Sequence, residues 1–292
     1  MAKAKRDIYQ EVTDLVIEAI ENGTQPWSRP WATGKGMALA LRHDGTPYRG
    51  INQFLLGMYQ MQAGFNSPHW MTYNQAKKLG GQVRKGEKGS MSVFFKMLEV
   101  DSKTNPGTKE NIPLLRHNMV FNAAQIDGLP DRFYAQPVEV NKDELIADAD
   151  EFFSKTGCPV KHGGNSAHLS LNTGVVHMPE FAAFKSANDY YATLAHETIH
   201  WVGLKRDEIE PDLFGSVNYA KEELVAEMGA AFTMAHLGLS SEPRPDHASY
   251  IQSGLKKLRD DKKFIFQASS KAQARVDDLI ARVEPKTETE AA

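Results

Sequence analysis

The pattern of apolar and polar residues divides the first half of the chain into helical and extended segments. Apolar positions recur every three or four residues in 6–21, 51–63 and 72–79, which predicts three amphipathic helices. Two apolar runs, 91–100 and 117–123, predict strands. The polar, turn-rich residues between these two runs predict an exposed hairpin loop.

The second half has longer helical periods and little strand. We expect helices over 141–156, 186–203, 219–236 and 246–282, and short strands over 167–171 and 174–178. Gly203 is a suitable stop for the second of these helices. The final residues, 284–292, are polar and charged and are expected to be disordered.

A boundary between two domains is predicted near residue 137. Residues 127–140 contain prolines and turn pairs and follow no clean period. The expected fold class is α+β with two domains. A mixed helix-and-strand domain covers 1–137, and a helix-rich domain with a small sheet covers 138–292.

Composition excludes several classes of protein. The chain has 292 residues, of which 41% are hydrophobic, so it can form a core and is not globally disordered. Its single cysteine, Cys158, excludes an internal disulfide framework and a cysteine-only zinc site. The sequence shows neither a signal peptide nor an apolar stretch of the roughly 20 residues that a membrane helix needs. A cytoplasmic protein with no membrane partner is therefore expected.

Charge is distributed unevenly along the chain. Residues 1–137 hold 17 basic and 12 acidic side chains, whereas residues 138–292 hold 17 and 25. Residues 22–98 carry 10 basic side chains and only two acidic ones. This segregation indicates a polyanionic partner for the first half, although a solvated basic face with no partner would give the same count.

The strongest motif is His-Glu-Thr-Ile-His at residues 196–200, an HExxH match. On a helix, His196 and His200 lie on one face and can bind one metal ion. Glu197 lies nearby and can take a proton from a water that the metal activates, so that the water attacks a polarised carbonyl. The alternatives are two histidines that only pack a helix and a metal site without catalysis.

A third protein ligand is expected downstream, because a catalytic zinc usually has three protein ligands and one open position. Glu223 and Glu227 lie one turn apart on the helix predicted at 219–236, and we assign Glu223 as the third ligand. We assign Glu227 to a hydrogen bond with a histidine ligand. Glu222 points elsewhere and is expected in solvent. Asp207 is the other candidate ligand, and a surface role for Glu223 stays open.

Weaker signals surround this motif. The strand at 175–178 precedes the motif helix and, as an edge strand, could hold an extended peptide. Tyr190, Tyr191 and Tyr219 are candidate oxyanion donors, although packing would also explain each of them. Zinc is the expected metal, and manganese suits the same His and Glu donors.

Basic and aromatic residues alternate in the Gly-rich loops of the first half, a pattern that suits single-stranded nucleic acid. Unpaired bases stack on aromatic faces, while Arg and Lys follow the phosphates. No recognition helix for duplex DNA is evident. The candidate DNA-binding residues are Trp27, Arg29, Trp31, Arg49, Asn52, Trp70, Tyr73, Lys77, Arg84, Lys85 and Lys88. For any single aromatic residue, a role as a core or loop anchor is slightly favoured, whereas the set together with the basic patch favours binding.

Several of these motifs, taken together, resemble the ArdC-type antirestriction proteins. The runs DIYQEVTDLVIEAIENGTQPWSRPW, YRGIN, SPHWMTYNQAKKLGGQVRKGEKG and VFNAAQIDGLP resemble their N-terminal domain. HETIHWVG and FGSVNYAKEELVAEMGAAF resemble their zincin-like C-terminal domain. The resemblance implies a plasmid-borne protein that binds single-stranded DNA and shields incoming DNA from restriction endonucleases during conjugation. It also implies similarity to a domain of plasmid primases.

Two kinds of function therefore remain open. In the first, a metallopeptidase with Glu197 as base acts on a host restriction enzyme or another protein substrate. In the second, a non-catalytic protein coats single-stranded DNA, and its metal domain is structural or docks a host protein. A primase accessory is a third interpretation, which the absence of a separate nucleotidyl-transfer motif in the sequence disfavours.

Overall fold

The computed structural model describes residues 7–22, 39–101, 108–134, 142–209, 217–239 and 255–284. Its first half contains helices α1 (Ile8–Glu21), α2 (Ile51–Ala63) and α3 (Tyr73–Lys78), and strands β1 (Trp70–Thr72), β2 (Gln82–Val83), β3 (Ser90–Asp101), β4 (Lys109–Asn122) and β5 (Ile126–Asp127). Its second half contains helices α4 (Lys142–Lys155), α5 (Ala187–Lys205), α6 (Val217–His236) and α8 (Phe264–Val283), and strands β6 (Val160–His162), β7 (His168–Ser170) and β8 (Val175–Met178).

The helices predicted from apolar periodicity are present, and polar caps fix several of their starts. The Asp7 carboxylate accepts a hydrogen bond from the Gln10 N–H at the start of α1. At the start of α3, Thr72 and Gln75 form a reciprocal capping box. The prediction of one continuous helix over 246–282 is wrong. Residues 255–260 are helical, but the Asp261 side chain accepts from the Lys263 N–H, and a new helix, α8, begins at Phe264.

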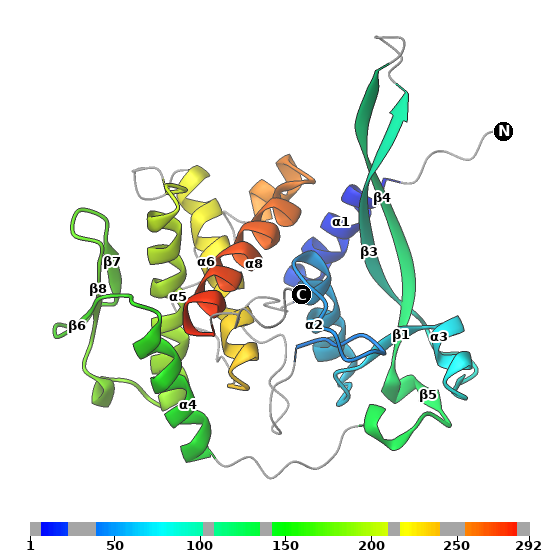
Figure 1. Ribbon diagram of the computed structural model, residues 1–292, viewed down its shortest axis with the longest axis horizontal. Coiled ribbons are helices and arrows are strands. Elements are labelled where there is room, and N and C mark those ends of the chain that lie inside the picture. The colour runs from blue at the N-terminus through cyan, green and yellow to red at the C-terminus, as the bar shows by residue number, and fades with distance from the viewer. Residues whose placement is uncertain are drawn as a thin grey trace, which may run out of the picture.

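The predicted hairpin loop is much shorter than expected. Strands β3 and β4 pair without interruption from Ser90 opposite Val120 to Asp101 opposite Lys109. An ion pair of 2.6 Å between Lys109 Nζ and Glu99 Oε1 joins the strands near their ends. Polar residues can form strands here because the hairpin extends from the body of the molecule and needs no apolar face (Figure 1).

The small sheet of the second half has the order β6-β8-β7. Strand β8 pairs with β6 in parallel and with β7 in antiparallel, so it is the central strand. The prediction of an edge strand at 175–178 is therefore wrong. The sequence pattern also missed β6, whose three side chains are exposed and carry no apolar alternation.

One hydrophobic cluster joins the two halves of the chain. Its buried residues include Val12 and Val16 of α1 and Phe54 of α2 together with residues of α4, α5, α6 and α8. In Figure 1, α1 and α2 accordingly lie between the sheet of the first half and the helices of the second. Two smaller clusters are formed by residues of the first half alone. Residue 137 lies outside the described residues, and the boundary there stays a prediction.

No helix in the described part of the chain has the length and apolar character needed to cross a bilayer.

Candidate metal centre

The HExxH motif lies in the middle of α5, a helix buried on all sides. The Ser186 hydroxyl caps its N-terminus by accepting from the Asp189 N–H. His196, Glu197 and His200 are only 4%, 6% and 8% exposed. They are buried because α6 covers the polar side of α5, and the two helices approach closely where Gly229 faces Ile199. A Cβ atom on Gly229 would lie 2.8 Å from that side chain.

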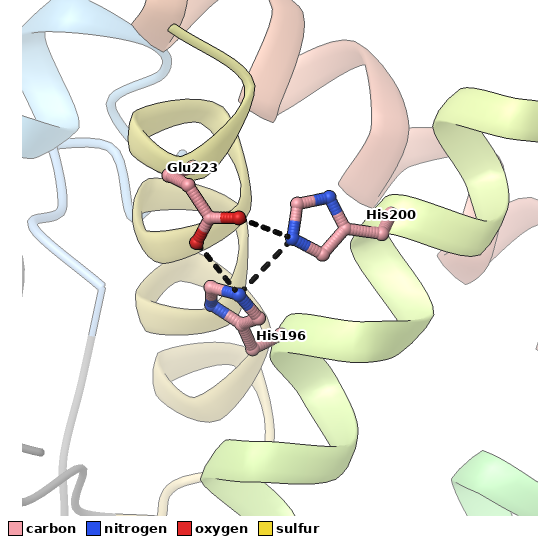
Figure 2. A group of neighbouring side chains, drawn as sticks. All are labelled: His196, His200 and Glu223. Atoms are coloured by element: carbon pink, nitrogen blue, oxygen red, sulfur yellow. Dashed lines mark hydrogen bonds and ion pairs between the residues drawn. The ribbon is translucent and has the colours of Figure 1, made fainter. Parts of the chain in front are cut away.

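The structure brings His196, His200 and Glu223 together, and Figure 2 shows their side chains facing one another. His196 Nε2 lies 3.1 Å from His200 Nε2 and 3.4 Å from Glu223 Oε2. His200 Nε2 lies 3.6 Å from Glu223 Oε1. Among the described residues this is the one group of three donors close enough to share an ion.

These distances fit a tetrahedral metal ion. Zinc binds imidazole nitrogen and carboxylate oxygen at about 2.0–2.1 Å, so two donors at tetrahedral angles lie about 3.3 Å apart. The three measured separations of 3.1–3.6 Å fall around this value. Only small shifts would be needed to accept an ion. Asp207, the alternative ligand, is exposed and does not belong to the donor group.

Glu227 lies behind His196. Its Oε1 is 2.9 Å from His196 Nδ1, the ring nitrogen opposite the donor group. Burial by itself would lower the pKa of His196, but the Glu227 and Glu223 carboxylates outweigh it and raise that pKa to about 10. Without a metal, His196 is therefore protonated at neutral pH.

Glu223 is held as a carboxylate. Burial by itself would raise its pKa, but the hydrogen bond from His196 and the charges of both histidines lower that pKa to about 2. Tyr219, one helical turn earlier on α6, also hydrogen-bonds to this carboxylate. Of the three tyrosines considered as oxyanion donors, Tyr219 is thus in direct contact with the donor group. Tyr190 instead bonds to His162, and Tyr191 to Asp150.

The carboxylate of Glu197 has a different environment. It is buried, yet among the described residues it forms no hydrogen bond or ion pair. Its lone pairs are available to a water molecule, as a general base requires. The nearby thiol of Cys158 does not compete with Glu197 as a base, because burial raises the thiol pKa to about 12 and keeps the thiol neutral.

The prediction for Glu222 is wrong. Its side chain is only 17% exposed, and Oε1 lies 2.9 Å from His200 Nδ1. Both of its oxygens also accept hydrogen bonds from the guanidinium of Arg275. Burial would raise the pKa of Glu222, but the bonds from His200 and Arg275 lower it. Glu222 therefore orients His200 in the same way that Glu227 orients His196.

Arg275 of α8 is the main residue that the sequence did not reveal. Its side chain is fully buried, and its Nε also donates to Glu208 Oε2 at 3.1 Å. A Cβ atom on Gly203 would lie 2.4 Å from Arg275 Cζ, so this glycine makes room for the guanidinium. The role predicted for Gly203 is wrong, since α5 continues to Lys205. A signal did exist in the sequence, because Arg275 interrupts the apolar face formed by Ala272, Val276 and Leu279.

The predicted DNA-binding residues divide into several groups. Trp27, Arg29 and Trp31 lie outside the described residues. Trp70 is 0% exposed and packs in a core cluster with Val120, so its ring has no face open to a base. The prediction for Trp70 is therefore contradicted.

Three other candidates form contacts within the fold. Asn52 exchanges two hydrogen bonds with the backbone of Val93, at 2.7 and 2.6 Å, and so ties α2 to β3. Arg49 pairs with Asp277 of α8. Arg84 donates to Glu87 and to the Ala124 carbonyl. The exposed candidates in the described ranges are Tyr73, Lys77, Lys85 and Lys88, together with Arg49 and Arg84 despite their ion pairs.

Comparison with known proteins shows which family has this two-domain architecture. Residues 6–121 match the family profile described as the N-terminal domain of anti-restriction factor ArdC, and residues 147–271 match a zincin-like metallopeptidase. The metal-free crystal structure of the antirestriction ArdC protein from plasmid R388 superposes with a TM-score of 0.81 at 40% identity, covering 97% of this chain and all of that one. The chain belongs to the ArdC antirestriction family. This confirms the predicted α+β fold class and its order of domains.

Further matches extend the comparison. The Mn(II)-bound structure of the same R388 protein gives a TM-score of 0.79 at 41% identity. Protein y4eC of Sinorhizobium fredii (strain NBRC 101917 / NGR234) is 39% identical over 94% of this chain and 92% of its own length. A DNA primase TraC of Escherichia coli is 35% identical over 98% of this chain, which spans only 28% of that primase.

Proposed function

We propose that this protein protects incoming DNA from host restriction endonucleases during conjugation. In this proposal the first half binds the entering single strand in the cytoplasm, and the second half holds one divalent metal ion. The main support for this proposal is the donor group of His196, His200 and Glu223 in a chain of the ArdC family. The excess of basic side chains in residues 22–98 supports a DNA-binding role for the first half.

The three donors would hold zinc or manganese, because imidazole and carboxylate suit both metals. A bound ion of this kind supplies Lewis-acid chemistry and activates water. Glu197 would accept a proton from a water molecule, and it is available because it forms no hydrogen bond or ion pair within the described ranges. Glu222 and Glu227 hold the two imidazole rings with Nε2 toward the donor group. Tyr219 stands beside Glu223, where it can donate a hydrogen bond to a developing oxyanion. The proposed reaction is peptide hydrolysis, with a host restriction enzyme as a candidate substrate.

A second function, non-catalytic coating of single-stranded DNA, has its own support. The relative named DNA primase TraC contains a segment similar to the whole of this chain within a much longer protein. A module attached to a primase is suited to holding a single-stranded template without cutting a protein. In that case the metal domain would be structural or would dock a host protein.

A transfer experiment separates these functions. Unmodified plasmid DNA is conjugated into a restricting host that expresses wild type, Glu197→Gln, or Lys85→Ala/Lys88→Ala at equal levels. The matched control is Lys161→Ala/Lys185→Ala, which removes two exposed lysines from the second half. The proposal expects protection to fall with Glu197→Gln and with Lys85→Ala/Lys88→Ala, and to survive in the control.

Each other outcome has a defined meaning. Full protection by Glu197→Gln, with loss only in Lys85→Ala/Lys88→Ala, would select the non-catalytic function. No protection by wild type in any restricting host would contradict the antirestriction role.

A further inference from the structure

The outer part of the β3–β4 hairpin exposes an unusual amount of apolar surface. Residues 91–93 of β3 are buried, but from Phe94 to Met97 every side chain is exposed. Phe94, Phe95 and Met97 are 48%, 55% and 48% exposed. In Figure 1 the hairpin passes beside α1, and its outer end projects beyond the helices. Large apolar side chains gathered on one projecting element are typical of a binding surface.

The two faces of this hairpin differ in chemistry. Successive side chains of a strand point to opposite faces, so Phe94 and Phe95 lie on opposite sides. Arg116 stands directly across from Phe94 in the register, and Lys96 follows on the same face. We call Phe94, Lys96 and Arg116 the Phe94 face. On the same face Lys96 stands across from Leu114. On the other face Phe95 stands across from Leu115 and Met97 follows it, so this stretch of that face carries neither Lys nor Arg, whereas Glu99 and Lys109 lie on it farther out.

The two cations of the Phe94 face are available to a ligand. Lys96 and Arg116 are exposed, and neither forms an ion pair with another residue in the described ranges. The nearest acidic residue along β3, Glu99, is paired with Lys109 farther out on the hairpin. Two more exposed lysines, Lys85 and Lys88, precede β3 at the base of the hairpin.

We propose that the Phe94 face is the platform on which this protein binds single-stranded DNA. An unpaired base stacks on the Phe94 ring, and Lys96 and Arg116 contact the phosphates on either side of it. The inference deepens the proposed function and rests on its DNA-binding half. A single strand fits better than a duplex, because only an unpaired base offers its face to an isolated ring. The charge of the face also favours a polyanion over an apolar protein partner.

The hairpin itself contains the matched control for this proposal. Phe95 neighbours Phe94 in sequence and is at least as exposed, but it lies on the opposite face. Binding of the full-length protein to a fluorescein-labelled oligothymidylate is measured by fluorescence anisotropy. Phe94→Ala is expected to raise the Kd about tenfold, whereas Phe95→Ala changes it less than about twofold. Phe94→Tyr keeps a stacking ring and is expected to bind as wild type does.

Salt dependence tests the two cations separately from the ring. Each phosphate contact to a single strand contributes about 0.7 to the slope of log Kobs against log salt. Lys96→Gln/Arg116→Gln should therefore reduce the slope by about 1.4, while Phe94→Ala leaves it unchanged. Circular dichroism and thermal unfolding confirm that the exposed substitutions leave the fold intact.

The outcomes distinguish this inference from the proposed function. If wild type binds the oligonucleotide but Phe94→Ala binds equally well, the Phe94 face is not the platform, although DNA binding stands. If Phe95→Ala weakens binding more than Phe94→Ala, the DNA lies on the opposite face and the inference is overturned. If wild type does not bind single strands at all, the DNA-binding half of the proposed function fails first.

Discussion

At the scale of single residues, the donor group is a buried cluster with an excess of acid. Glu222, Glu223 and Glu227 surround two histidines, and Glu197 lies beside them. Without a metal, the proton on His196 balances part of this negative charge. A divalent cation would take the place of that proton and would balance more of the charge. The residues are thus arranged to exchange a proton for a metal ion.

Metal binding is accordingly expected to release about one proton from His196 near neutral pH, because metals bind the neutral imidazole. Isothermal titration calorimetry in buffers of different ionisation enthalpy measures this release. Affinity should also rise about tenfold per pH unit below the His196 pKa of about 10. Binding heats that do not vary with the buffer would contradict this assignment.

The shifted pKa values of His196 and Glu223 predict how the stability of the metal-free protein depends on pH. The His196 pKa is raised from 6.5 to about 10, so its contribution is complete below pH 6.5 and is lost as pH rises toward 10. The Glu223 pKa is lowered from 4.5 to about 2, so its contribution is complete above pH 4.5 and is lost as pH falls toward 2. The Tm of the chelated protein should fall between pH 6.5 and 10, and fall less in His196→Gln. An equal alkaline fall in both proteins would show that His196 is not the cause.

At the scale of elements, helix α8 supports the metal centre from outside the HExxH helix. Arg275 connects Glu222, and through it His200, to Glu208, which lies just beyond the end of α5. Glu222 thus contacts His200 on one side and Arg275 on the other. A residue 75 positions after His200 thereby influences the orientation of a metal-binding ring.

Arg275→Met should leave Glu222 buried without its cation. We expect a loss of about 3–5 kcal/mol in the free energy of unfolding, and a metal affinity reduced about 10–100-fold. Urea unfolding and metal titration measure the two effects. The control is Arg282→Met on the same helix, which removes a part-exposed ion pair of 3.4 Å with Asp278 and a guanidinium contact over the Trp201 ring, each worth about 1 kcal/mol or less. Equal effects of the two substitutions would contradict a special role for Arg275.

The elements also show what a sequence can predict and what it cannot. The helices followed from their own periodicity, and HExxH from a spacing that one helix turn determines. Glu222 was misplaced because its neighbours come from α5 and α8, which no pattern within α6 reveals. Trp70 was misplaced because composition cannot tell a core tryptophan from a stacking one. The short strands β2, β5 and β6 depend on pairing partners and carry no clear period.

At the scale of the whole molecule, the two halves share one core. Helices α1 and α2 of the first half pack in the same hydrophobic cluster as α5, α6 and α8. Polar contacts reinforce this packing, since the Thr13 hydroxyl donates to the Lys262 carbonyl and the Gly50 N–H to Gln273. A stabilising event in the second half should therefore be felt in the first.

Metal binding is expected to protect α2 as well as α5 from amide hydrogen exchange. Metal at about 100 times its Kd stabilises the folded state by about 2.7 kcal/mol, which slows globally exchanging amides about 100-fold. Hydrogen exchange read by mass spectrometry compares α2 peptides in the chelated and loaded protein, with the exposed outer hairpin as the control. Slowing confined to residues 142–284 would show that the two halves unfold independently.

The most direct measurement of the central claim is the stoichiometry of bound metal. Wild type, Glu223→Ala, His196→Ala and Glu197→Gln are loaded with zinc or manganese, passed through a desalting column and analysed for metal content. One ion per chain is expected in wild type and in Glu197→Gln, and a strong loss of metal is expected in Glu223→Ala and His196→Ala. One ion retained at full affinity in Glu223→Ala would contradict the metal centre described here.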